Sequence, residues 1–361
     1  MKLMSYYLFM ALITLANERK IGLGYATYII AELNTSHFGD LNLAKRMIDG
    51  AKEAGADCVK FQSWSESSLY SQEFYSQNRL AQKFIEKFAL KENDLLVLNQ
   101  YAKSVGIDFA STPYSESEAD FLTEVCKAPF IKVASMDLNN LQYLEYLSKK
   151  TTPIFLSTGM GTMDEIVLAI KVLSKHKFHE IGILHCVSLY PTNDSMLNLR
   201  NIKGIRETLP GYVVGFSDHS IGNLASVASV ALGASIVEKH VTLDATKIGM
   251  DNQMAMEMKD FSNLVSQIRK VEKMLGTEMR MVSELEVSKS LEMRRSVVAA
   301  VDLKVGDVLT QEKLTLKRPG TGIPAHRISE VLGLVVKQEI RAGTLLNLSS
   351  INTEKISGKS F

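Results

Sequence analysis

Short runs of apolar and β-branched residues alternate along this chain with stretches whose apolar residues recur at helical spacing. Residues 41–54, 94–105, 163–174 and 223–232 have the helical pattern, and residues 259–275 predict a further helix. The β-type runs are residues 27–34, 58–62, 108–111, 130–135, 154–157, 181–185, 213–217 and 236–240.

Strict alternation of strands and helices predicts a parallel sheet. Eight such units within about 250 residues fit the size of a closed (β/α)8 TIM barrel better than that of an open, doubly wound sheet. We therefore expect an α/β chain in which residues 27–282 form the barrel.

The pattern changes on both sides of this region. Residues 283–294 are polar and predict a linker, and residues 295–361 contain short apolar strands separated by turn residues, which predicts a small β-rich domain. Residues 1–26 predict an N-terminal extension, with a hairpin turning at residues 17–20. The apolar run at residues 3–16 also has the outline of a signal peptide, although residues 17–20 make a poor cleavage site.

Charge and cysteine content limit the classes of function. The 41 Lys and Arg residues balance 40 Asp and Glu residues, so no bulk field would attract nucleic acid or an anionic membrane. Cys58, Cys126 and Cys186 are odd in number and lie in core-like runs, which indicates reduced thiols in a cytoplasmic protein.

Polar residues end most of the predicted strands. The active site of a TIM barrel lies at the carboxyl ends of its strands, so these positions carry the functional hypothesis. The alternative to a functional site is a polar rim that is hydrated by water. Charged residues at the ends of apolar strands, however, need ion-pair partners or a ligand. The positions include Glu32 with His37 beyond it, Lys60, Gln62, Thr112, Lys132, Ser135, Ser157, His185, Ser217, His219 and His240.

His219 and His240 end neighbouring strands, which are about 4.8 Å apart in a parallel sheet. Both imidazoles could therefore bind one divalent ion, with the remaining positions open to water or substrate. A hydrogen-bonded structural role for each histidine is equally consistent with the spacing.

Positive charge and hydroxyl groups gather at the same mouth. Lys60, Lys132, Ser135, Ser157 and Ser217 suit a phosphate and a carboxylate. The segment at residues 157–162 leads from a strand into a helix, where free backbone N–H groups add affinity for anions, although such a glycine motif is weak evidence by itself.

Several ordered motifs carry a family resemblance. The chain contains "FASTPYSESEADFL", "IKVAS", "FLSTGM", "LHCVSLYPT", "VVGFSDHSIG", "ALGASIVEKHVTLD" and "RPGTGI", after an opening "IIAELNTSHFGD". In these it resembles the sialic acid synthase family, which includes legionaminic and pseudaminic acid synthases. The resemblance runs from about residue 29 into the C-terminal region.

The resemblance implies a phosphoenolpyruvate-dependent synthase that adds three carbons to an amino-sugar aldehyde. It implies a barrel followed by an antifreeze-like SAF domain, and a domain-swapped homodimer. Mn²⁺ or Mg²⁺ would bind His219 and His240. Phosphoenolpyruvate would bind Lys60, Thr112, Lys132, Ser135, Ser157 and Ser217. The sugar would face Glu32, Gln62, Tyr190 and Asp251, with Arg318 of the other subunit reaching its N-acyl group.

Two departures from the family pattern affect the expected sugar pocket. The usual "NHNGD" is "SHFGD" here, with Ser36 and Phe38, and the frequent "GPDH" is "GMDN", with Met250 and Asn252. The catalytic hypothesis keeps Glu32, His219, His240 and Asp251, with Glu32 or Asp251 positioning the sugar or moving a proton.

Two rival functions stay open at this stage. Lys60 or Lys132 could form a Schiff base with pyruvate in a metal-free aldolase. An antifreeze-like domain could instead belong to an ice- or glycan-binding protein, a reading that leaves the polar strand ends unexplained. The sequence leaves open whether the acceptor is N-acetylmannosamine, its 6-phosphate or a 2,4-diacetamido-dideoxy hexose.

Overall fold

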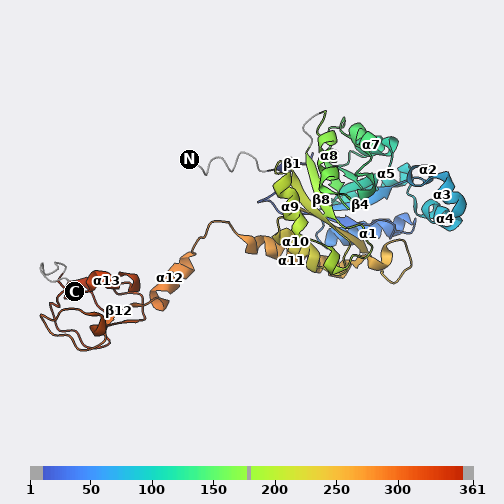
Figure 1. Cartoon of the computed structure of the whole chain (residues 1–361). Coiled ribbons are helices and arrows are strands. Elements are labelled where there is room, and N and C mark those ends of the chain that lie inside the picture. The colour runs from blue at the N-terminus through green and yellow to red at the C-terminus, as the bar shows by residue number, and fades with distance from the viewer. Residues whose placement is uncertain (1–10, 177–179, 353–361) are drawn as a thin grey trace. The chain divides into compact units, whose positions relative to one another are not determined.

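The computed structural model describes residues 11–176 and 180–352 as two compact units, which divide between Gly276 and Thr277. The first unit contains eight parallel strands hydrogen-bonded in the order β5-β4-β3-β10-β9-β8-β7-β6, with β5 and β6 in contact where the path ends (Figure 1). The predicted (β/α)8 architecture is confirmed as a nearly closed parallel barrel.

The strands lie close to the predicted runs. They are β3 (Tyr28–Glu32), β4 (Cys58–Ser63), β5 (Asp108–Pro113), β6 (Ile131–Val133), β7 (Ile154–Ser157), β8 (Ile181–Cys186), β9 (Val213–Asp218) and β10 (Ile236–Thr242). A short strand, β11 (Met256–Glu257), pairs with the end of β10.

Helices follow the strands and cover the outside of the barrel (Figure 1). They are α1 (Leu41–Glu53), α5 (Glu92–Val105), α6 (Glu116–Asp120), α7 (Leu141–Leu147), α8 (Met163–Leu173), α9 (Arg200–Thr208), α10 (Leu224–Ala231) and α11 (Met258–Leu275). Their limits follow capping chemistry. The Asp40 carboxylate accepts from Asn42 N and Leu43 N at the start of α1, and Gly106 ends α5 in the left-handed conformation with φ 74°.

Three short helices extend between β4 and α5: α2 (Glu66–Leu69), α3 (Gln72–Gln77) and α4 (Arg79–Phe88). Trp64, Tyr75 and Ile85 form a small separate core beneath them. None of the helices in the described ranges is both long enough and apolar enough to cross a membrane.

A hairpin closes the amino-terminal end of the barrel. Strands β1 (Leu12–Thr14) and β2 (Lys20–Gly22) pair antiparallel around the turn predicted at residues 17–20. Ile13, Leu15 and Ile21 are buried among the residues that fill the barrel floor. Part of the apolar run considered as a signal peptide therefore packs in the core, while residues 3–10 lie outside the described residues.

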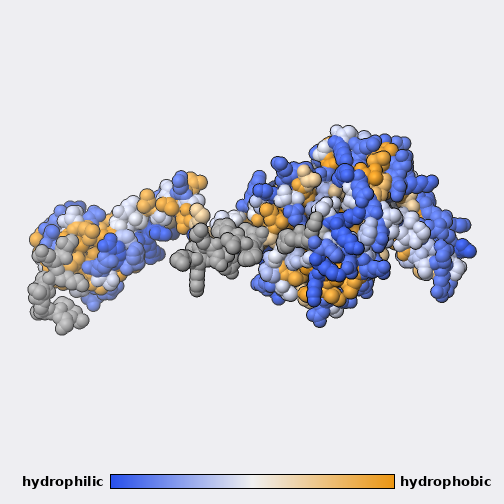
Figure 2. Space-filling model, turned by 90° about the horizontal axis from the view of Figure 1, so that it is seen from above, coloured by the Kyte–Doolittle hydropathy of each residue, from blue (hydrophilic) through white to orange (hydrophobic). Residues whose placement is uncertain are grey.

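The second unit has its own apolar core, which includes Val297, Leu309, Val336 and Leu346. It contains α12 (Glu284–Met293), β12 (Ser296–Ala299), β13 (Leu314–Lys317) and α13 (Ile328–Val331), and β12 pairs antiparallel with β13. The segment at residues 283–294, expected as a linker, thus holds a helix. Figure 2 shows hydrophobic side chains at the surface of α12, where Leu285, Val287 and Leu291 are exposed.

Candidate active site

The barrel interior is layered because alternate side chains on each strand point inward. The lower layer is apolar and packs with the hairpin. Its members are Tyr28, Ile30, Cys58, Ala110, Phe130, Phe155, Leu184, Val213 and Ile236. The inward positions closer to the carboxyl ends include a polar set that is buried or half-buried: Glu32, Lys60, Gln62, Thr112, Lys132, Ser157, Ser217, Glu238 and His240. Strand periodicity thus sets an ionisable layer directly above an apolar floor.

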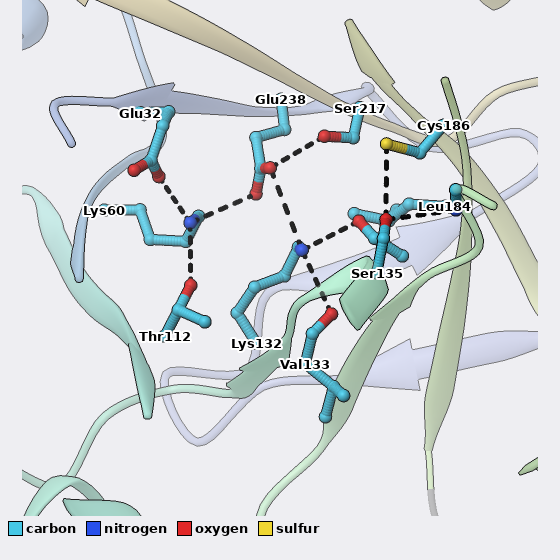
Figure 3. Close-up of polar contacts among 12 residues, drawn as sticks. Glu32, Lys60, Thr112, Lys132, Val133, Ser135, Leu184, Cys186, Ser217 and Glu238 are labelled. Carbon is cyan, nitrogen blue, oxygen red and sulfur yellow. Dashed lines mark hydrogen bonds and ion pairs between the residues drawn. The ribbon is translucent and has the colours of Figure 1, made fainter. Parts of the chain in front are cut away.

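Lys60, on β4, is surrounded by oxygen atoms from three other strands, β3, β5 and β10. Its ammonium group forms an ion pair with Glu32 and donates to Thr112 Oγ1 over 2.9 Å. Glu238 Oε2 lies 3.7 Å from the same nitrogen (Figure 3). A cation held in this way has a fixed position at the centre of the barrel.

Lys132 approaches Glu238 from the opposite side of the barrel (Figure 3). Its ammonium group donates to Ser157 Oγ over 2.7 Å and lies 3.9 Å from Glu238 Oε1. The Ser217 hydroxyl donates to the same carboxylate oxygen over 2.8 Å. Glu238 therefore bridges two lysines that are both nearly inaccessible to solvent.

Glu238 is the principal site residue that the sequence analysis missed. It lies within β10 rather than at its end, so attention to strand-ending residues passed over it. The signal was available, because Glu238 is two residues before His240 and strand side chains alternate faces. Any inward-pointing histidine on a strand implies that the residue two positions earlier points inward as well.

Burial and ion pairing shift the pKa values of Glu32 and Glu238 in opposite directions. Burial raises the pKa of Glu32 to about 7, although Lys60 opposes this effect. Burial also acts to raise the pKa of Glu238, but Lys132 and Lys60 outweigh it and hold the value at about 2. The layer therefore contains one permanently charged carboxylate and one that can exchange a proton near neutral pH.

The two lysines also differ from each other. Burial lowers the pKa of Lys132, and Lys60 opposes its charge further, so Glu238 compensates only in part. For Lys60, Glu238 and Glu32 outweigh the effect of burial and raise the pKa. An anionic ligand would therefore stabilise the charge of Lys132 in particular.

A polar network extends from Glu32 toward the predicted sugar pocket. Gln62 Nε2 and the backbone N–H of Asn34 donate to Glu32 Oε1 over 3.3 and 3.1 Å. Tyr114 Oη donates to Gln62 Oε1, and Asn34 donates to the Asp251 carboxylate. The structure thus connects three of the predicted sugar residues, and it adds Asn34 and Tyr114, which the sequence analysis did not single out.

His219 and His240 lie together, with ring centroids 5.3 Å apart. Tyr190 packs against both rings, 4.1 Å from His219 and 5.9 Å from His240. His219 Nδ1 lies 2.7 Å from the Val187 carbonyl oxygen. Because a carbonyl only accepts, Nδ1 carries a proton, which leaves Nε2 as the nitrogen that can bind a ligand. Burial acts to lower the pKa of His219, but Cys186 and the Val187 carbonyl outweigh it and raise the pKa, so a metal ion would compete with a proton for Nε2.

The histidine pair fits a divalent cation. Burial lowers the pKa of His240 well below its usual value, and the neighbouring His219 adds to this effect, so the ring is neutral and can act as a ligand. The carbonyl contact of His219 is the outer contact that metal-bound histidines typically make. In the described part of the chain, no three His, Cys, Asp or Glu side chains form a ready ligand set. Two imidazoles would leave most coordination positions to water and substrate oxygen.

Two hydroxyl groups lie close to the backbone of Gly159, at the end of β7. The Gly159 N–H donates to Ser135 Oγ over 3.0 Å, and a Cβ at Gly159 would overlap Ser188 Oγ. Ser188 Oγ is buried without a hydrogen-bond partner among the described residues. Glycine thus leaves room here for two hydroxyl groups at the carboxyl end of β7.

The two departures from the family pattern make structural contacts. Phe38 packs edge-on against Phe88, with ring centroids 5.8 Å apart. Asn252 is buried, accepts from Thr242, and donates to the carbonyls of Asp244 and Lys247 over 2.8 Å. Asn252 therefore holds the loop that carries Met250 and Asp251.

His37 and His185 are buried as single structural residues. His37 Nδ1 accepts from the Gly39 N–H over 3.0 Å. His185 points out of the barrel, where Nε2 contacts the Leu197 carbonyl over 2.7 Å. Neither lies with the His219 and His240 pair.

Arg318 belongs to the second unit and is exposed. The turn that contains it is held internally. Ser296 Oγ donates to the Pro319 carbonyl and accepts from the Gly322 N–H, and the Gly320 N–H donates to the Leu291 carbonyl. The guanidinium thus projects from a fixed turn.

Comparison with known proteins supplies the family. The model of the NeuB family matches residues 47–280, and that of the SAF domain matches residues 294–351. The chain belongs to the NeuB family. The C-terminal SAF domain predicted from the resemblance is confirmed.

Named relatives of the NeuB family are similar over most of their length. The chain is 36% identical over 335 residues to N,N'-diacetyllegionaminic acid synthase of Campylobacter jejuni, which covers 89% of this chain and 98% of that protein. It is 35% identical over 324 residues to human N-acetylneuraminate-9-phosphate synthase, a match that covers 87% of this chain and 90% of that protein.

A solved structure agrees with this assignment. N-acetylneuraminic acid synthetase from Leptospira borgpetersenii has a TM-score of 0.72 and 33% identity to this chain, covering 78% of this chain and 95% of that one. These similarities support enzymatic synthesis of a sialic-acid-type sugar and argue against a solely ice- or glycan-binding role.

Proposed function

We propose that this protein condenses phosphoenolpyruvate and water with an unphosphorylated, N-acylated amino-sugar aldehyde, forming a carbon–carbon bond and releasing phosphate. The observation that carries the proposal is the buried Lys60–Glu238–Lys132 arrangement beside the His219 and His240 pair. Two fixed cations suit a small substrate that carries both a phosphate and a carboxylate, and two adjacent imidazoles suit a divalent metal.

The lysines would bind the two charged ends of phosphoenolpyruvate. Lys60 with Thr112 and Lys132 with Ser157 each combine an ammonium group with a hydroxyl donor. Ser135 and Ser217 would complete the set of donors. Because these groups are already ordered, they stabilise charge on the enolpyruvate and on the departing phosphate without reorganising.

The metal in this proposal is Mn²⁺ or Mg²⁺, bound by Nε2 of His219 and by His240. When bound, it would supply a Lewis acid that polarises the acceptor aldehyde. Tyr190 packs against both rings and would limit their rotation.

Glu32 and Asp251 are the proposed catalytic carboxylates. Burial raises the pKa of both, that of Glu32 to about 7. Glu32 can therefore accept or release a proton at neutral pH, and Gln62 and Asn34 hold its carboxylate in place. Asp251, held by Asn34, would orient the sugar.

The cavity next to Asp251 is the reason for proposing an acceptor without a phosphate. This cavity has a volume of about 180 Å³ and is lined by Tyr190, Pro191, Ile221, Met250, Asp251, Gln253 and Met254. No lysine or arginine is among these lining residues. A carboxylate and several apolar side chains favour a neutral sugar with apolar substituents over a phosphorylated one.

The Schiff-base aldolase is the second candidate, because burial lowers the pKa of Lys132 and favours a neutral amine. Contacts with Glu238 and Ser157 restrict the rotation of that amine. Borohydride reduction with pyruvate distinguishes the candidates by mass. We expect no covalent adduct.

We further propose a cytoplasmic, domain-swapped homodimer in which Arg318 contributes to the partner's site. All three cysteines are buried and free, which suits a reducing compartment. Apolar side chains such as Met279, Met281 and Leu285 are at least two-thirds exposed and would be covered by a second copy.

The function is tested with a panel of aldoses, phosphoenolpyruvate and Mn²⁺, scored by phosphate release and product mass. We expect phosphate release with N-acetylmannosamine or a 2,4-diacetamido-dideoxy hexose. Absence of phosphate release with every N-acylated aldose would contradict the proposal.

A further inference from the structure

A buried ion pair lies on the outer face of β9 and β10, behind the histidines. Asp218 and Lys239 occupy directly opposed positions on the two strands, and Lys239 Nζ donates to Asp218 Oδ2 over 2.9 Å. The two residues are 0% and 1% exposed. Neither faces the barrel interior, so neither belongs to the ligand set described above.

The Asp218–Lys239 ion pair also forms hydrogen bonds to the backbone next to His219. Asp218 Oδ1 accepts from both the N–H and the hydroxyl of Ser220, over 2.8 and 2.7 Å. Lys239 Nζ donates to the Ser220 carbonyl over 2.6 Å. The residue after His219 is therefore held at its N–H, its carbonyl and its side chain by one ion pair.

Further contacts fix the pair itself and the peptide of His219. Ser226 Oγ, on α10, donates to Asp218 Oδ2 over 2.5 Å. The Thr192 N–H donates to the His219 carbonyl over 2.9 Å. Asp218 immediately precedes His219, and Lys239 immediately precedes His240, so the pair ties together the backbones of both histidines.

Stability alone does not account for this pair. The other outward positions on the same strands are apolar, as at Val214, Phe216 and Val237. A buried ion pair is often no more stabilising than apolar residues of similar volume, because both charges lose their hydration. Its presence beside two candidate ligands indicates a geometric role.

We propose that Asp218 and Lys239 are positioning residues that hold His219 and His240 at the separation required to bind one divalent cation. This inference rests on the proposed function, since it assigns a purpose to the metal pair. The ion pair acts through the strand backbones and through Ser220, and makes no contact with substrate.

The test compares Mn²⁺ affinity, measured by the electron paramagnetic resonance signal of free Mn²⁺, with and without phosphoenolpyruvate. The double variant Asp218→Asn/Lys239→Met removes both charges together, so no unpaired buried charge is left. Loss of contacts behind metal ligands typically weakens metal binding about 10- to 100-fold, and we expect a loss in this range. Far-ultraviolet circular dichroism and the unfolding temperature verify the fold.

Two further variants separate positioning from general destabilisation. Arg269→Met removes an ion pair with Asp57 at 3.0 Å, at the start of the strands, and should lower stability without changing Mn²⁺ affinity. Ser226→Ala removes only the hydroxyl that holds Asp218 and should weaken Mn²⁺ binding to a smaller extent. If the double variant fails to fold, Ser226→Ala decides the question.

Mn²⁺ affinity within twofold of the wild type in the folded variants would overturn the inference while leaving the proposed condensation intact. Wild-type protein that releases phosphate without binding Mn²⁺ would also overturn it. Wild-type protein that binds Mn²⁺ through His219, but condenses no aldose, would contradict the proposed function and leave the positioning role standing.

Discussion

Ser217 and Glu238 oppose each other on β9 and β10, and the serine hydroxyl donates to the glutamate carboxylate over 2.8 Å. This contact fixes the rotamer of Glu238 between Lys60 and Lys132. Without an anionic ligand, Glu238 is the only carboxylate within 4.0 Å of the Lys132 ammonium among the described residues. Glu238 and a bound anion would therefore both compensate that charge.

Glu238→Gln should make the protein depend on an anion for stability. The amide keeps the shape of the side chain but leaves the Lys132 ammonium without a carboxylate. A buried charge without a partner destabilises the fold. We expect the unfolding temperature to fall by several degrees in buffer without phosphate and to recover more with inorganic phosphate than the wild type does. Glu124→Gln, which makes the same change at an exposed carboxylate, is the control. Equal responses to phosphate in Glu238→Gln and in the wild type would count against this role of Glu238.

Removal of the metal should abolish phosphate release and leave the fold intact, because the apolar floor and the helices do not depend on the two histidines. His219→Ala and His240→Ala should do the same, with losses of at least about 100-fold in kcat, as expected when a Lewis acid is lost. His185→Ala is a matched control, since that histidine points away from the pair. Near-normal turnover by a variant verified to be metal-free would show that the metal assignment is wrong.

Met250→Lys should change the choice of acceptor. A cation in the cavity beside Asp251 would favour a phosphorylated sugar and disfavour neutral sugars with apolar substituents. We expect the ratio of kcat/KM for the 6-phosphate to that for the unphosphorylated sugar to rise about tenfold or more. Met274→Lys, at the exposed end of α11, controls for added surface charge. An unchanged ratio would place the sugar elsewhere.

Stability should fall in mild acid through His37. Burial lowers the pKa of His37 to about 4 in the folded protein, against 6.5 for the free group. Between these values the unfolded chain binds more protons, so the stability present above pH 6.5 is lost as the pH falls toward 4. The loss is roughly 3 kcal/mol.

The contribution of His37 is isolated by His37→Gln, which still offers an acceptor to the Gly39 N–H but does not titrate in this range. Urea unfolding at pH 7, 6 and 5 should give a shallower pH dependence for the variant. The other histidines act equally in both proteins. Parallel pH profiles would show that His37 is not the group responsible.

Strand periodicity explains how much of the site was predictable. Lys60, Lys132, His219 and His240 follow from the sequence, because a parallel barrel brings its strand ends together whatever the loops do. Glu238 follows from the same alternation applied one step further back.

Contacts made by loops were not predictable in this way. The contact of Asn34 with Asp251 joins loops more than 200 residues apart, and the position of each loop depends on how the whole barrel closes. The Asp218–Lys239 pair was hidden for another reason. Two charged residues within apolar strands resemble exposed positions until the helix that covers them is known.

The proposed dimer can be tested through Arg318. Ser296 and the end of α12 hold its turn rigidly, so the guanidinium would have a fixed reach toward an N-acyl group. Arg318→Ala should raise the KM for the sugar at least about tenfold, while the KM for phosphoenolpyruvate changes little, because the anion site is built from the barrel alone. Arg341→Ala, in the same unit, is the control for loss of an exposed arginine.

Mixing two impaired proteins, assayed at a sugar concentration well below KM, then shows which subunit supplies the arginine. Arg318→Ala subunits are unfolded and refolded together with His219→Ala subunits, which forms mixed dimers. If the arginine acts on the partner's site, one site of each mixed dimer has both residues and the other has neither, so activity reappears on mixing. If it acts within its own subunit, every site carries one defect and mixing restores nothing. The second result would refute the domain-swapped dimer and would assign Arg318 to the barrel of its own chain.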